Sequence, residues 1–168
     1  HSRKDIIKSL RLSADDERRV QAIPIGVSPQ FKPAAAPPGA RPPTLLYVGR
    51  MDPYKNVGGV IQTLARARAI SGQDIRLSII GPPDARYPSP REQARAFGME
   101  PFVNEAGYLP DGDLLRTYQQ ASALILLSRY EGFGLPVLEA MACGTPVVCS
   151  HASSLPEVAG DAALLVAP

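Results

Sequence analysis

The sequence ALILLSRYEGFGLPVLEAMACGTPVVCS at residues 123–150 places a helix between two apolar runs. The run at 123–127 is typical of a strand buried on both faces. Pro136 suits the first turn of a helix, where its missing N–H costs nothing, and Gly144 is expected to end that helix. The apolar residues 146–149 predict a second buried strand. Alternation of buried strands with helices favours a parallel α/β sheet.

The loop at residues 129–134 joins the first strand to the helix and carries features of a ligand site. Gly132 and Gly134 have no Cβ, so they tolerate positive φ and the close approach of a ligand. The N-terminus of the following helix presents unpaired N–H groups and the positive end of its dipole, which suit a phosphate or a sugar hydroxyl.

Two carboxylates flank this loop. Glu131 lies within it, and Glu139 lies about one turn into the helix, where side chains tilt back toward the N-terminus. An acidic side chain beside a phosphate-binding helix start can accept hydrogen bonds from both hydroxyls of a ribose. In the alternative interpretation, Glu139 complements the helix dipole and Glu131 is a solvated loop charge.

A second candidate loop, GRMDPYKN at residues 49–56, follows the strand predicted at 44–48. Open α/β sheets bind ligands at the carboxyl ends of their strands. Arg50 offers a planar fork of donors and Lys55 a mobile point charge, which together match a diphosphate. The alternative is two solvated loop cations. Asn56 is expected to cap the next helix.

Strand and helix patterns alternate through the rest of the chain. Strands are expected at 75–81, near 102–103 and at 163–166, and helices at 90–97 and from residue 111. Ser89 with Glu92, and Ser154 with Glu157, stand at the spacing of a capping box. Five or six strand–helix repeats predict a Rossmann-like, doubly wound parallel sheet with right-handed crossovers.

Residues 1–43 are expected to lie outside the main domain, which we place at residues 44–168. The opening mixes apolar and charged residues and predicts a short amphipathic helix. The stretch PAAAPPGARPP at 33–43 can neither pair in a sheet nor continue a helix, so it is typical of an exposed linker. Because the sequence begins at His1 and ends just after an apparent strand, we expect a fragment or an excised domain.

Composition narrows the classes of function. With 45% hydrophobic and 20% charged residues, the chain has the composition of an ordinary globular protein. Its formal net charge of +2 is spread over scattered Lys and Arg residues, which argues against nucleic-acid binding. No apolar run reaches the roughly 18 residues of a membrane-spanning helix, and we expect a cytoplasmic protein.

No metal site is expected. Cys143, Cys149 and His151 lack a fourth ligand and a recognised zinc spacing, and both thiols are expected to be buried. Asp111 and Asp113 suggest a magnesium pair, but they are placed to open a helix, where Asp complements the dipole. The two cations of the second loop already supply the positive charge that an ion would bring, so metal-independent ligand binding is predicted.

The stretch EGFGLPVLEAMA at 131–142, followed by GTPVV at 144–148, resembles the signature of the retaining, nucleotide-sugar-dependent glycosyltransferases of family 4, which have the GT-B fold. The loop at 49–56 resembles the second motif of that family, in which the Arg and the Lys hold the donor diphosphate. The similarity covers roughly residues 28–166. It implies the Rossmann-like C-terminal half of a GT-B enzyme, without the N-terminal acceptor domain.

The resemblance also implies a reaction. A sugar moves from a nucleoside diphosphate sugar, of UDP or GDP type, to an acceptor hydroxyl with retention at the anomeric carbon and without a further cofactor. Glu131 is the implied catalytic residue facing the donor sugar, and Glu139 holds the ribose. The implied donor-binding residues are Arg50, Lys55, Tyr108, Leu109, Gly132, Phe133, Gly134, Leu135 and Glu139. In the family, the segment that corresponds to residues 108–109 lies beside the nucleotide base.

The implied acceptor is a glycan, a lipid or another hydroxyl compound held by the missing N-terminal domain, so this chain alone is expected to bind the donor but transfer little sugar. Peripheral membrane contact of the full protein is left open. The family usually has an acid where Ser28 stands, so the contact of that acid is not carried over. Donor base, sugar and oligomeric state stay open.

Three alternatives remain. A non-catalytic nucleotide-binding or interaction module, or a related GT-B epimerase, could use the same scaffold. A phosphorylase would need a lysine for pyridoxal phosphate, and no Lys follows Lys55.

Overall fold

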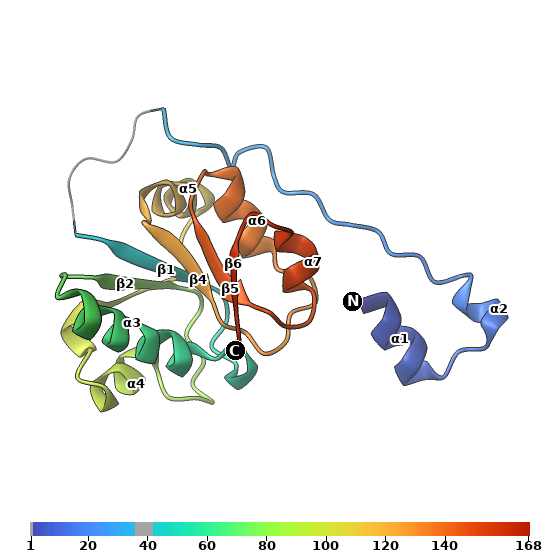
Figure 1. The fold of residues 1–168 in the computed structure, drawn as a ribbon, viewed down its shortest axis with the longest axis horizontal. Coiled ribbons are helices and arrows are strands. Elements are labelled where there is room, and N and C mark those ends of the chain that lie inside the picture. The colour runs from blue at the N-terminus through green and yellow to red at the C-terminus, as the bar shows by residue number, and fades with distance from the viewer. Residues whose placement is uncertain (1, 36–41) are drawn as a thin grey trace.

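Six parallel strands form the sheet in the computed structural model, which describes residues 2–35 and 42–168 (Figure 1). The strands are β1 (Thr44–Val48), β2 (Arg76–Ile80), β3 (Val103–Gly107), β4 (Ala123–Leu126), β5 (Val147–Ser150) and β6 (Leu164–Val166). They lie in the order β3-β2-β1-β4-β5-β6, and every neighbouring pair is parallel. The predicted Rossmann-like, doubly wound sheet is confirmed.

Helices cover both faces of this sheet. Those that connect strands are α3 (Val57–Ser71), α4 (Pro90–Ala96), α5 (Asp111–Gln120), α6 (Leu135–Ala142) and α7 (Leu155–Ala159), with short 3₁₀ turns η1 (Pro53–Lys55) and η2 (Glu100–Phe102). α3 packs against α4, whereas α6 packs against both α5 and α7 (Figure 1). α3 and α4 lie on one face of the sheet, whereas α5, α6 and α7 lie on the other (Figure 1). Right-handed crossovers require this, because the chain moves from β1 toward β3 in one direction and then toward β6 in the opposite direction.

The two central strands are buried on both faces. Leu46 and Tyr47 are neighbours on β1, so their side chains point to opposite faces, and both are fully buried. Residues 124–126 of β4 are buried in the same way. Because helices exclude water from both faces, these strands are continuous apolar runs rather than alternating ones.

The N-terminal helices α1 (Ser2–Leu10) and α2 (Ala14–Glu17) lie apart from the sheet and are joined to it by an extended segment (Figure 1). The predicted opening helix is present, but exposed apolar side chains occur on it and on the extended segment, namely Ile6, Leu10, Ile23 and Ile25. Farther along the segment, Phe31 is buried in the core, where its ring packs edge-on against that of Tyr118 with centroids 5.7 Å apart.

Most of the linker predicted at 33–43 falls on residues 36–41, outside the described residues. Within the part of the chain that the structure describes, no helix is long and apolar enough to cross a membrane.

Two predicted helix caps are wrong, and both side chains make long-range contacts instead. Asn56 occupies the N-cap position of α3 but makes no cap hydrogen bond, since its backbone is left-handed with φ of +57° rather than extended. Its amide donates instead to the carbonyl of Leu127. Ser154 precedes α7 without capping it, since its backbone is already helical with φ of −84° and ψ of −14°. Its hydroxyl is directed instead at carbonyls of the loop before α6. The capping box of Ser89 and Glu92 is confirmed.

Gly81, directly after β2, occupies a position that only glycine fits. Its φ is +154°, and a Cβ there would lie 1.9 Å from the carbonyl oxygen of Gly49. Gly49 directly follows β1 and its N–H donates to the carbonyl of Ile80 at 2.9 Å, so the missing side chain of Gly81 lets the carboxyl ends of β1 and β2 approach closely.

We expect Gly81→Ala to lower the free energy of unfolding by about 3 kcal/mol or more, because backbone strain is joined by a clash with a carbonyl that cannot move independently. Gly72→Ala is the matched control, since Gly72 also has positive φ but its Cβ would meet nothing within 4 Å. That variant should lose about 1 kcal/mol. Urea unfolding measures both, and equal losses would contradict the packing argument.

Candidate functional site

The two predicted ligand loops lie side by side at the point where the strand order reverses. β1 pairs with β4, so the loop at 49–56 and the loop at 129–134 follow strands with neighbouring carboxyl ends. The side-chain amide of Asn56 donates to the carbonyl of Leu127 at 3.1 Å, and the backbone N–H of Arg129 donates to the carbonyl of Tyr54 at 2.8 Å. This reversal is where open α/β sheets form their ligand crevice.

A buried ion pair joins the two loops. The Nζ atom of Lys55 lies 2.8 Å from each carboxylate oxygen of Glu131, and the two side chains are 15% and 9% exposed. The structure thus brings together two site residues that are 76 positions apart. Neither charge is well solvated, so each depends on the other for neutralisation.

The loop after β5 holds Glu131 from the other side. The backbone N–H of Glu131 donates to the hydroxyl oxygen of Ser153 at 2.7 Å, and its carbonyl accepts from the hydroxyl of Ser154 at 2.9 Å. The single hydroxyl proton of Ser154 is shared with the carbonyl of Phe133, which lies 2.8 Å from the same oxygen. Three successive strands of the sheet therefore determine where Glu131 lies.

Arg50 lies on the same loop as Lys55, and its side chain is exposed to solvent. Its Nε atom lies 3.1 Å from a carboxylate oxygen of Asp52, and its carbonyl accepts from the buried hydroxyl of Tyr47 at 2.7 Å. The other carboxylate oxygen of Asp52 lies 3.7 Å from a guanidinium nitrogen of Arg86. The same guanidinium donates hydrogen bonds to Asp84 and lowers the pKa of that carboxyl group to about 2. The ion pair with Asp52 uses Nε, so the two outer nitrogens of Arg50 remain suited to a bidentate anion.

Two helices begin at the site without a side-chain cap. Neither Asn56 at the start of α3 nor Gly134 at the start of α6 makes a cap hydrogen bond, which leaves first-turn N–H groups of α3 for a ligand. In α6 the first turn offers fewer, because Pro136 has no N–H and the N–H of Val137 donates to the carbonyl of Gly134 at 3.0 Å. Gly134 has φ of +108°, and a Cβ there would lie 2.7 Å from the side chain of Leu155. Gly132 is exposed, Phe133 is half-buried and Leu135 is the first residue of α6.

Glu139 lies on α6, half-buried, and its partner is a residue that the sequence did not indicate. The hydroxyl of Tyr118 on α5 donates to Oε2 of Glu139 at 2.6 Å. Burial raises the pKa of Glu139, and the hydrogen bond from Tyr118 opposes that rise. The sequence predicted a helix from residue 111 but no role for Tyr118. The signal that could have indicated one is that a buried tyrosine hydroxyl normally has a polar partner.

Tyr108 and Leu109 are not brought to the ion pair. They follow β3, and β2 separates β3 from β1. Tyr108 is 76% exposed, whereas Leu109 packs against the core. In the described chain no hydrogen bond links either residue to the other predicted site residues, so their contact with a base stays a prediction.

The residues weighed as metal ligands are dispersed. Asp111 and Asp113 open α5 as predicted, and Asp113 pairs with Arg116. Cys143 and Cys149 are free and buried, which confirms that prediction, and burial raises the pKa of both thiols. Among residues 2–35 and 42–168, no group of three or more His, Cys, Asp or Glu side chains could hold a metal ion. Metal independence stays a prediction.

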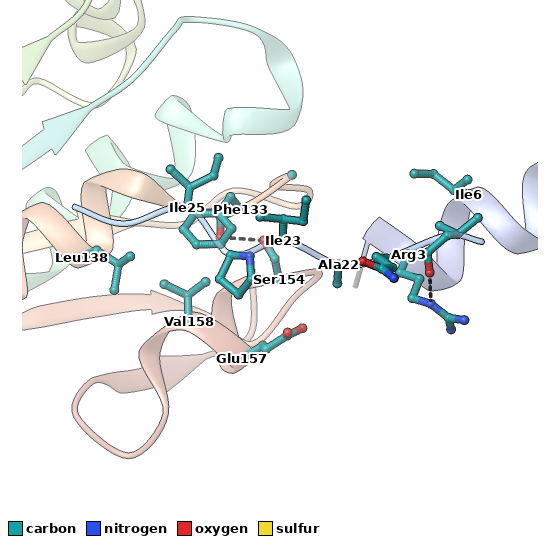
Figure 2. Close-up of a pocket in the computed structure, with 14 residues that line it drawn as sticks. Arg3, Ile6, Ala22, Ile23, Ile25, Phe133, Leu138, Ser154, Glu157 and Val158 are labelled. Atoms are coloured by element: carbon teal, nitrogen blue, oxygen red, sulfur yellow. Dashed lines mark hydrogen bonds between the residues drawn. The ribbon is translucent and has the colours of Figure 1, made fainter. Parts of the chain in front are cut away.

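A hollow of about 740 Å³ lies beside the site, between the N-terminal segment and the helices α6 and α7 (Figure 2). Its apolar wall includes Ile23, Ile25, Phe133, Leu138 and Val158. It shares Phe133 and Gly132 with the candidate site, but none of the charged site residues lines it. We therefore place the candidate site at the ion pair rather than in this hollow.

We expect Lys55→Met and Glu131→Gln each to cost about 3 kcal/mol of unfolding free energy, because each leaves an uncompensated buried polar group. The double variant should lose clearly less than the sum. Arg76→Met is the control, since its pair with Asp74 at 3.1 Å is exposed and should contribute under about 1 kcal/mol. Urea unfolding of the wild type, the two single variants and the double variant measures the coupling free energy between Lys55 and Glu131. Additive losses would argue against a coupled pair.

Comparison with solved structures supports the fold. The chain superposes on the C-terminal domain of the glycosyl transferase group 1 family protein LpcC from Francisella tularensis with a TM-score of 0.71 and 24% identity, covering 85% of this chain and 80% of that one. The predicted match to the C-terminal half of a GT-B fold is confirmed.

Curated relatives are longer than this chain. It is 39% identical over 135 residues to O-antigen chain mannosyltransferase B of Escherichia coli, covering 73% of this chain and 32% of that protein. It is 31% identical over 172 residues to the MMP alpha-(1->4)-mannosyltransferase of Mycolicibacterium hassiacum, covering 99% of this chain and 40% of that protein. The family described as Glycosyl transferases group 1 matches residues 30–168, and the chain belongs to this family.

Proposed function

We propose that this chain binds a nucleoside diphosphate sugar and forms the donor half of a retaining, metal-independent glycosyltransferase of the hexosyltransferase type. The observation that carries the proposal is the contact between Lys55 and Glu131 where β1 and β4 adjoin. It sets a cation suited to phosphate directly against an acid suited to sugar hydroxyls, beside two uncapped helix starts.

In this proposal the diphosphate leaving group is stabilised by Arg50, Lys55 and the N–H groups near residues 132–135. Charge develops on the diphosphate as its bond to the sugar breaks, and donors already aimed at that position lower the barrier. Glu131 faces the donor sugar, where it binds hydroxyls or stabilises positive charge at the anomeric carbon. Glu139 holds the ribose.

The donor is of UDP or GDP type, and the base lies near residues 108–109. Relatives named mannosyltransferases make hexosyl transfer the natural assignment. Acceptor binding is assigned to another part of a longer protein, because this chain spans only 32–40% of those relatives. We further propose a cytoplasmic location and no nucleic-acid partner.

We expect one of UDP, GDP and ADP to raise the thermal stability of this chain in EDTA, by about 2.7 kcal/mol at a hundred times its Kd. Lys55→Ala and Glu139→Gln should reduce that ligand-induced rise, because each removes a proposed contact. Arg66→Ala, which removes an exposed cation in the middle of α3, should leave it unchanged. If none of the three diphosphates stabilises the chain, donor binding is contradicted.

We expect the isolated chain to bind donor but to transfer almost no sugar, whereas the full-length protein should transfer with retention. NMR of the product of the full-length protein gives the anomeric configuration. Inversion would contradict the retaining assignment, and robust transfer by this chain alone would contradict the assignment of acceptor binding elsewhere. Binding without transfer by the full-length protein would identify a non-catalytic nucleotide-binding module.

A further inference from the structure

Tyr118 is held rigidly in the core. It is fully buried on α5, and its ring meets Phe31 edge-on at 86°. Its backbone carbonyl accepts from the hydroxyl of Thr145 at 2.7 Å. Both the ring and the backbone of Tyr118 are therefore fixed by residues far away in the sequence, so its hydroxyl has a defined position.

That hydroxyl is directed at one oxygen of Glu139. The O–H donates to Oε2 at 2.6 Å, which is in the range of a short, charge-assisted hydrogen bond. Burial and the neighbouring carboxylate raise the pKa of Tyr118 above its usual value, so the hydroxyl keeps its proton and remains a donor. A free glutamate side chain would instead sample several rotamers.

The other oxygen, Oε1, takes part in no hydrogen bond within the described residues. With Oε2 occupied, the carboxylate presents Oε1 in one orientation as an acceptor. A sugar hydroxyl is a donor that such an oxygen can recognise, and a site built around a substrate hydroxyl rejects an analogue lacking it because a buried polar atom is left unpaired.

We propose that Tyr118 is a positioning residue that fixes the Glu139 carboxylate and thereby makes the site select ribonucleoside over 2′-deoxyribonucleoside diphosphates. The inference rests on the donor binding proposed above. Tyr118 acts through Glu139 and does not itself contact the ligand.

The test is titration calorimetry of the 168-residue chain with UDP, GDP and ADP and with their 2′-deoxy counterparts. In the wild-type chain the preferred ribonucleotide should bind about tenfold or more tightly than its deoxy form, as loss of a hydrogen bond to a charged group implies. Tyr118→Phe should reduce that ratio to about threefold or less. The change removes one oxygen and keeps the ring that packs on Phe31.

Tyr47→Phe is the matched control. Tyr47 is the other fully buried tyrosine, and its hydroxyl donates to the carbonyl of Arg50 at 2.7 Å rather than to Glu139. Loss of this bond should leave the ratio between the two forms unchanged, whatever its effect on the affinity for each. If removal of a buried hydroxyl acted only by disturbing the core, the ratio would change by a similar amount in Tyr118→Phe and in Tyr47→Phe.

A double variant and a pH series separate positioning from packing. Tyr118→Phe combined with Glu139→Gln should have the same ratio as Glu139→Gln alone. The hydrogen bond from Tyr118 lowers the pKa of Glu139, while burial and Asp111 raise it, and Cys143 is the other titratable group nearby. Without the Tyr118 hydroxyl that pKa rises, so in Tyr118→Phe ribonucleotide binding should weaken at a higher pH than in the wild type as pH falls.

An unchanged ratio in Tyr118→Phe would overturn the inference while leaving donor binding intact, and so would a wild-type chain that binds both sugar forms equally. Failure of all three ribonucleotides to bind would overturn the proposed function and this inference with it. If Tyr118→Phe does not fold, Glu139→Asp takes its place, because the shorter acid no longer reaches the hydroxyl of Tyr118. A ratio in Glu139→Asp equal to that of the wild type would also overturn the inference.

Discussion

The parallel pairing of β1 with β4 is the constraint on which the candidate site depends. It sets Leu45 opposite Ala123 and Leu46 opposite Leu124, so the loops after these strands leave the sheet at the same level. The contacts between these two loops follow from that register, including the buried pair of Lys55 and Glu131. A parallel strand cannot slip by one residue without moving its side chains to the opposite face. The continuous core on both faces therefore fixes the geometry of the polar site above it.

Burying two charges is costly, and the surrounding loops offset that cost with well-placed partners. Both oxygens of Glu131 meet Lys55, and the backbone of Glu131 is held by Ser153 and Ser154. A buried pair of this kind adds little to stability compared with apolar residues of the same volume. On the proposed function, its place at the sheet reversal serves ligand binding, which needs charges that are fixed but not fully hydrated.

Much of this fold was predictable because buried strands and amphipathic helices leave a periodic pattern in the sequence. Both ligand loops were predictable because glycine, proline and charge cluster at the ends of those strands. The partners of individual side chains were not. Asn56 and Ser154 fitted local capping rules, but contacts 71 and 23 residues away in the chain took precedence. Periodicity specifies which face of an element is buried, whereas such contacts depend on how the elements are arranged in space.

The two acids of the central stretch are held by different kinds of partner, and this difference separates their proposed roles. Glu131 is neutralised by a cation that a diphosphate would also attract, so arrival of a ligand phosphate changes the electrostatic environment of Glu131. Glu139 is held by the neutral hydroxyl of Tyr118, which a phosphate does not attract as strongly. On the proposed function, one carboxylate responds to the donor, while the other keeps the orientation that the core gives it.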